Sequence, residues 1–171
     1  MPISMSSASL PICNTMLGNL SHLLDKAQAF IDEKKCEPSA LLQYRMAPDM
    51  LNFTRQIQIA CDSAKNGAAR LSGVEAPKFE DTEATVAELK ARIQKTLDFL
   101  ASIPQPKLDG TEAKDITFPV GPNATRTLSG EAYLKHSMLP NLFFHVTTAY
   151  LILRHNGVAV GKRDYLAGAS A

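Results

Sequence analysis

The sequence predicts an all-α protein in which four long helices form a four-helix bundle, with a small β-hairpin between the third and fourth helices. Three observations lead to this prediction. Apolar residues recur at helical spacing in three long segments, a fourth segment is apolar around most of its circumference, and most connections are short. The chain has 171 residues, 45% hydrophobic and 20% charged. That length and balance suit one globular domain spanning residues 1–171.

The first two long helices are indicated by their apolar stripes. One stripe runs over residues 12–31. A short turn or helix follows at 39–44, after Pro38. The second long helix is expected to begin at Pro48, with the acidic Asp49 in its first turn, and to end at Gly73.

The third helix is expected to begin near residues 81–83 and to stop at Pro104. Two β-like runs at 115–120 and 125–128 flank a turn and predict the hairpin. Ser129 is a suitable N-cap for the fourth helix, which continues past Pro140 to His155. Residues 158–171 are expected to form an irregular C-terminal tail.

Composition excludes several classes of partner. The formal net charge is +1 and no basic stripe is present, so a nucleic-acid partner is not expected. No apolar run reaches the roughly 20 residues of a membrane span, and the first residues lack the features of a signal peptide. The three cysteines show no metal-ligand spacing, which favours reduced thiols in a cytoplasmic protein.

The fourth helix carries polar residues on a face that should point into the bundle. Asn141, His145 and Thr148 share that face. Asp49 and Gln56 are seven residues apart on the second helix, at the edge of its apolar stripe. These five residues predict a polar pocket between the second and fourth helices, with His145 as a base or metal ligand. The alternative is that the same residues form a buried hydrogen-bond cluster that fixes helix register.

Several of these residues belong to motifs of a known family. The chain resembles, from about Ile3 to Leu166, a bacterial family of unknown function that is similar to the DinB/YfiT-like superfamily. The resemblance rests on Ala47-Pro48-Asp49-Met50, Gln56, Ala69-Arg70-Leu71, Pro140-Asn141, Phe144-His145-Val146-Thr147-Thr148-Ala149-Tyr150, Ile152-Leu153-Arg154-His155-Asn156-Gly157-Val158 and Gly161-Lys162-Arg163-Asp164-Tyr165-Leu166.

The resemblance implies a four-helix bundle that is often a homodimer, and in many members a metal held by three histidines. One of those histidines falls at Gln56, and an HxxxH pair falls at Asn141 and His145. Two of the three ligands have therefore become amides, which bind transition metals weakly. The resemblance thus implies a degenerate metal site with no tightly bound cofactor. A weakly bound divalent cation, with Asp49 as a ligand, stays open.

Three functions remain open from the sequence. The first is a protein that binds a small molecule in the polar pocket. The second is a metal-dependent enzyme of the thiol transferase or hydrolase type that uses His145 with Asp49 and Gln56. The third is a structural or oligomeric interaction protein. No catalytic residue is assigned.

Overall fold

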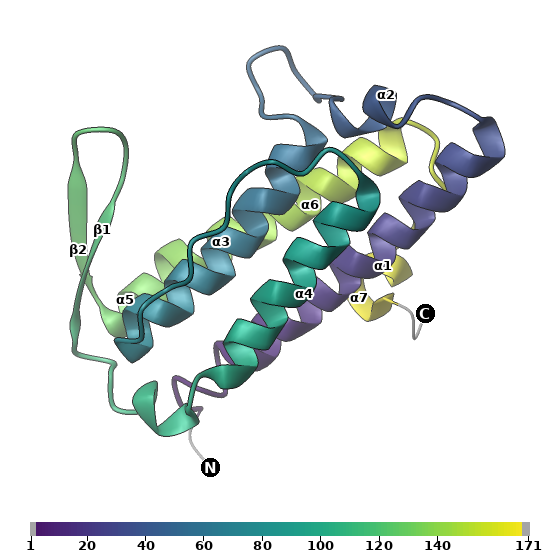
Figure 1. Ribbon diagram of the computed structural model, residues 1–171. Coiled ribbons are helices and arrows are strands. Elements are labelled where there is room, and N and C mark those ends of the chain that lie inside the picture. Colours follow the sequence, from purple (N-terminus) through teal and green to yellow (C-terminus); the bar gives the residue numbers. More distant parts are fainter. Residues whose placement is uncertain (1–2, 169–171) are drawn as a thin grey trace.

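The computed structural model describes residues 3–168, and four long helices lie side by side in it (Figure 1). The α3 helix packs against α4 and α6, and α1 packs against the same two helices from the other side. A two-stranded antiparallel hairpin lies at one end of these helices and α2 at the other. The bounds of the long helices are α1 (Leu10–Lys34), α3 (Phe53–Ser72), α4 (Val86–Ser102) and α6 (Leu139–His155). A mostly helical fold with one small hairpin is therefore confirmed.

The apolar stripes predicted from the sequence form the core between these helices. The largest fully buried side chains come from α1, α2, α3 and α4 and from the segment after α4: Phe53, Leu17, Leu20, Leu23, Leu24, Leu42, Ile57, Leu71, Leu89, Ile93, Leu100 and Leu108. Burying each such side chain contributes about 1.5–3 kcal/mol. The core therefore fixes the helices that position the polar groups described below.

The α3 helix begins at Phe53, five residues later than the predicted start at Pro48. Asn52 is the N-cap, and its side-chain oxygen accepts a hydrogen bond from the backbone N–H of Arg55 at 2.9 Å. The backbone N–H of Phe53 donates to the carbonyl of Tyr44 at 2.9 Å. The short α2 helix (Pro38–Leu42) is thereby joined to the start of α3, and Asp49 lies in a turn before the helix.

The α4 helix also begins later than residues 81–83. Thr85 and Glu88 form a capping box, in which the Thr85 hydroxyl accepts from the N–H of Glu88 and the Glu88 carboxylate accepts from the N–H of Thr85. Asp81 and Glu83 do not cap the helix because their carboxylates pair with Arg92 at 2.9 and 3.0 Å.

The hairpin pairs β1 (Asp115–Pro119) with β2 (Thr125–Ser129), as the sequence predicts. It follows α4 and the short 3₁₀ turn η1 (Gln105–Lys107) in the chain. Ile116 and Phe118 are buried against the helices while their neighbours in β1 are exposed. The hydroxyl of Ser129 accepts from the N–H of Ala132 at 3.4 Å, which confirms Ser129 as an N-cap.

The segment that follows Ser129 changes helical type before α6. It comprises α5 (Gly130–Tyr133) and a π-helical turn, η2 (Leu134–Met138), and Pro140 stands in the first turn of α6. The backbone stays helical from Gly130 through Pro140, because the residues at both junctions keep right-handed helical dihedral angles. Pro140 therefore does not begin a separate helix, and the π-helical turn before it accommodates the proline.

The C-terminal segment departs from the expected irregular tail of residues 158–171. It contains the helix α7 (Lys162–Ala167), and residues 169–171 lie outside the described part of the chain. The Asp164 carboxylate accepts from the N–H of Gly161 at 2.7 Å and contacts Nε2 of His22 at 2.8 Å. These contacts stabilise a short helix against α1 that local apolar periodicity does not reveal.

The α6 helix is buried on most of its circumference but not on all of it. Phe144 is 55% exposed and Leu151 is 44% exposed, so the apolar circumference that the sequence shows is not fully buried on that face. Both side chains lie seven residues apart, on one stripe that no other described helix covers. Across residues 3–168, no helix combines the length and the apolar character that a membrane span requires.

Candidate functional site

Gln56 and His145 form a direct pair between α3 and α6. Nδ1 of His145 lies 2.7 Å from Oε1 of Gln56, and Nε2 of Gln56 donates to the carbonyl of Leu51 at 2.9 Å. The bond to Leu51 fixes the orientation of the amide, so its oxygen faces the imidazole. Nδ1 of His145 must therefore carry the proton and donate, which leaves the lone pair on Nε2.

The imidazole of His145 is only 7% exposed. Burial disfavours the charged form and lowers the pKa of His145 from 6.5 to about 4. At neutral pH the ring is consequently an uncharged hydrogen-bond donor to Gln56. A group with so low a pKa is poorly matched to general acid–base catalysis near pH 7.

The other predicted pocket residues do not gather around this pair. Asn141 is exposed rather than interior, and its Nδ2 donates to Oγ of Ser63 at 2.7 Å. Thr148 is buried as expected, but its hydroxyl donates within α6 to the carbonyl of Phe144 at 2.8 Å. Asp49 is exposed and precedes α3, because that helix begins only after Asn52.

The three positions at which the resemblance places metal ligands do not fit a metal ion. The oxygen of Gln56 is occupied by the Nδ1–H of His145, and Asn141 is directed at Ser63. Within residues 3–168, no group of three His, Cys, Asp or Glu side chains is arranged to hold a metal ion.

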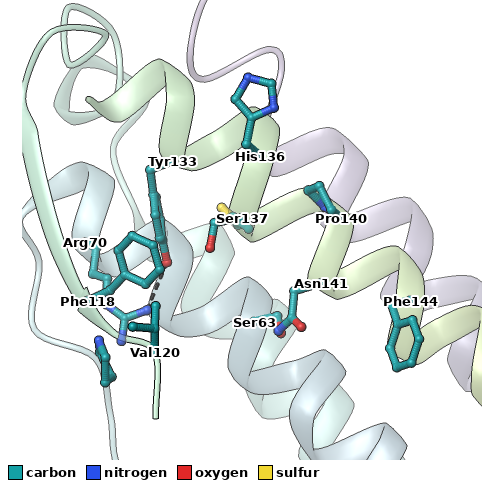
Figure 2. Close-up of a pocket in the computed structure, with 12 residues that line it drawn as sticks. Ser63, Arg70, Phe118, Val120, Tyr133, His136, Ser137, Pro140, Asn141 and Phe144 are labelled. Atoms are coloured by element: carbon teal, nitrogen blue, oxygen red, sulfur yellow. Dashed lines mark hydrogen bonds between the residues drawn. The ribbon is translucent and has the colours of Figure 1, made fainter. Parts of the chain in front are cut away.

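A cleft of about 490 Å³ lies further along α3 and α6, where the hairpin meets the helices. We call it the hairpin cleft, and Figure 2 shows it. Its lining comes from α3, β1, α5, η2 and α6 and includes Ser63, Arg70, Phe118, Tyr133, Asn141 and Phe144. Of the predicted pocket residues, only Asn141 lines it.

The position of Arg70 in this cleft is set by buried aromatic rings. Nη1 of Arg70 donates to the hydroxyl of Tyr133 at 2.9 Å (Figure 2). Tyr133 is 3% exposed, and its ring packs on Phe118 with 4.8 Å between centroids. Tyr133 therefore holds the guanidinium group from a rigid support made by α5 and β1.

The π-helical turn η2 forms a second wall of the cleft. His136 and Ser137 of this turn line it together with Pro140. Pro140 has no N–H, so it cannot donate to the carbonyl of His136 in the regular helical pattern. Isolated π-turns inside helices frequently occur at functional sites, and this one lies directly at the cleft.

Sequence reasoning gave no chemical role to Arg70, Tyr133 or His136. Arg70 occurs in the motif Ala69-Arg70-Leu71, but its partner Tyr133 is 63 residues away in sequence. Only the docking of the hairpin and α5 on α3 brings them together. In the sequence, only the motif Ala69-Arg70-Leu71 indicated that Arg70 has a role.

A buried ion network on the opposite side of α3 was also missed. Arg92 is 2% exposed and contacts carboxylates of Asp62, Asp81 and Glu83 at 3.2, 2.9 and 3.0 Å. Helical phase places Asp62 on the outer face of its helix, and its side chain is partly exposed there, where Arg92 of α4 reaches it. The network anchors the segment between α3 and α4, and Glu83 and Arg92 also line a second cleft of about 320 Å³.

Comparison with known proteins places the chain in a family. Residues 5–166 match the domain family described as "Domain of unknown function (DUF1993)". The chain is similar to a crystal structure of a DinB family member protein from Shewanella denitrificans, at 43% sequence identity and a TM-score of 0.88. That similarity covers 95% of this chain and 91% of the other. No curated protein sequence matches this chain.

Proposed function

This chain belongs to the DUF1993 domain family of unknown function, and from its geometry we propose that it binds a small molecule in the hairpin cleft. The observation that carries the proposal is the cleft itself. It has the size of a small-ligand site, and its lining places several polar groups beside apolar side chains.

The polar groups of the cleft are available to a ligand. Asn141 uses one N–H on Ser63, so its oxygen and second N–H remain free among the described contacts. Phe118, Phe144 and Val120 supply apolar surface on the facing walls. We thus place the ligand nearer the hairpin than the pocket expected from sequence, but still between α3 and α6, in a DinB/YfiT-like four-helix bundle.

The Gln56–His145 pair supports a different role, that of fixing the register of α3 on α6. Its groups bond to each other and to the backbone rather than to a common cavity. We propose that it is the remnant of a degenerate metal site and that its role is structural. A metal-dependent enzyme of the thiol transferase or hydrolase type gains no support from this arrangement.

Ligand-observed NMR with a set of small carboxylic acids, amides, alcohols and amines tests the proposal. Ser137→Trp fills the cleft from η2, and Ser102→Trp adds the same side chain at an exposed position at the end of α4. Some compounds should show saturation transfer with the wild type and with Ser102→Trp, but not with Ser137→Trp. Circular dichroism checks that both variants fold.

Two results would count against the proposal. One is that no compound in the set binds the wild-type protein. The other is that binding persists unchanged in Ser137→Trp, which would place the compounds elsewhere on the surface.

A further inference from the structure

The lining of the hairpin cleft is basic. Its twelve residues include Arg70 and His136 but no aspartate or glutamate. The nearby Glu131 in α5 pairs with Lys135 and so does not offset this charge. The cleft therefore presents an uncompensated positive charge, which attracts anions.

Arg70 has donors left for a ligand. A guanidinium carries five N–H groups, and one of them is used on the hydroxyl of Tyr133. Among residues 3–168, no carboxylate lies within ion-pair distance of Arg70. The one buried side-chain nitrogen or oxygen without a partner in that range is Nε of Arg92. The remaining N–H groups of Arg70 are thus open to solvent.

The hairpin carries a further cation, Arg126, on the same face as a residue that lines the cleft. Arg126 of β2 pairs in register with Phe118 of β1. Residues directly opposite each other in an antiparallel pair project from the same face. Arg126 consequently lies on the face of the hairpin that carries Phe118 towards the helices, and its exposed charge adds to the positive potential there.

The polar groups also set the length of a ligand. Ser63 and Arg70 are seven residues apart on α3, which is about 10 Å along the helix axis. Asn141, bonded to Ser63, therefore marks one end of the cleft and Arg70 the other. The rings of Phe118 and Tyr133 lie beside Arg70 at one end of the cleft. Phe144 lies beside Asn141 at the other end (Figure 2).

We propose that the ligand of the hairpin cleft is a monocarboxylate with an apolar or aromatic body, held at its carboxylate by Arg70. This inference rests on the proposed function and adds the chemical class of the ligand. A single planar guanidinium matches the charge and the two oxygens of one carboxylate. Tyr133 is a positioning residue, because its hydroxyl orients the guanidinium from a buried, ring-packed site.

The test compares 4-phenylbutanoate with its neutral counterpart 4-phenylbutanamide, by isothermal titration calorimetry and by ¹H–¹⁵N NMR. The acid should bind the wild type about tenfold or more tightly than the amide, since hydrogen bonds to charged groups are the stronger ones. Arg70→Gln should reduce this preference to about twofold or less. Arg70→Lys keeps the positive charge but loses the paired N–H donors of the guanidinium. Its preference for the acid should lie between those of the wild type and Arg70→Gln.

Tyr133→Phe tests whether the hydroxyl of Tyr133 orients the guanidinium of Arg70 or whether Tyr133 only supports the wall of the cleft. It should weaken binding of the acid while leaving binding of the amide within about twofold, because the apolar walls stay intact. If Arg70→Gln fails to fold, Arg70→Lys and Tyr133→Phe still decide the question.

The outcomes distinguish this inference from the proposed function. Equal binding of acid and amide by the wild type would overturn the carboxylate assignment and leave a ligand-binding cleft. The same holds if neither compound binds at millimolar concentration while only amides, alcohols or amines of the compound set occupy the cleft. If no compound of the set binds, both the carboxylate assignment and the proposed ligand-binding function are overturned.

Discussion

Protonation of His145 should destabilise the fold between pH 6.5 and pH 4. The native imidazole has a pKa of about 4, because burial disfavours its charged form, whereas the ordinary value is 6.5. In this window the unfolded chain binds a proton that the native state does not. The free energy of unfolding therefore rises with pH through the window, and the contribution of His145 is complete above pH 6.5.

The two pKa values set the size of the effect. At about 1.4 kcal/mol for each pH unit between them, the loss on acidification to pH 4 is about 3 kcal/mol. Carboxylates in ion pairs also lower the free energy of unfolding when they become protonated. The contribution of His145 is therefore isolated by comparing the wild type with a variant that lacks this histidine. His145→Gln removes the titrating group at similar size.

Urea unfolding followed by circular dichroism at pH 7, 6, 5 and 4 measures this comparison. The wild type should be more stable than His145→Gln at pH 7, and the difference should shrink by about 3 kcal/mol by pH 4. His136→Gln, at an exposed position, is the control and should retain the full acid dependence. Parallel curves for the wild type and His145→Gln would refute the reasoning.

Two further predictions concern stability and are read by the same urea assay. Arg92→Met should cost about 1–3 kcal/mol, because it removes the charged hydrogen bonds that the buried guanidinium makes to three partly exposed carboxylates; an unchanged stability would mean that the ion network does not hold its segment. Gly18→Ala should gain about 0.5–1 kcal/mol, since a Cβ there meets no atom within 4 Å and glycine is unfavourable inside a helix. Gly130→Ala should instead be destabilising, because its Cβ would lie 2.0 Å from the carbonyl oxygen of Thr111; a neutral result would contradict this packing.

The helices were predictable because each carries its own periodic signal, but their first residues were not. Pro48 and Asp49 form a plausible helix start by composition. The true N-cap, Asn52, was not distinguished because the chain before α3 is shaped by the contact of Phe53 with Tyr44. At α4 the signal was present: Thr85 and Glu88 have the spacing of a capping box.

The sequence predicted the candidate site only where the face of a single helix determines whether a side chain points into the interior. His145 is interior, as its position on α6 indicates, and its partner Gln56 comes from the expected side of α3. Asn141 shares that face by helical phase but lies nearer the end of α6, where the helices leave it exposed. Arg70 and Tyr133 meet through the docking of α5 and the hairpin, which no local pattern encodes.

One wall of the hairpin cleft is supplied by a segment that the helical core does not need. Pro119 and Val120 line the cleft, yet they are exposed and lead into a turn closed by the bond from the N–H of Val120 to the carbonyl of Ala124. Exchange of residues 119–125 can thus reshape the outer wall while the buried side of the hairpin, at Ile116 and Phe118, stays anchored. Changes in this loop can therefore alter the shape of the cleft independently of the residues that make the protein fold.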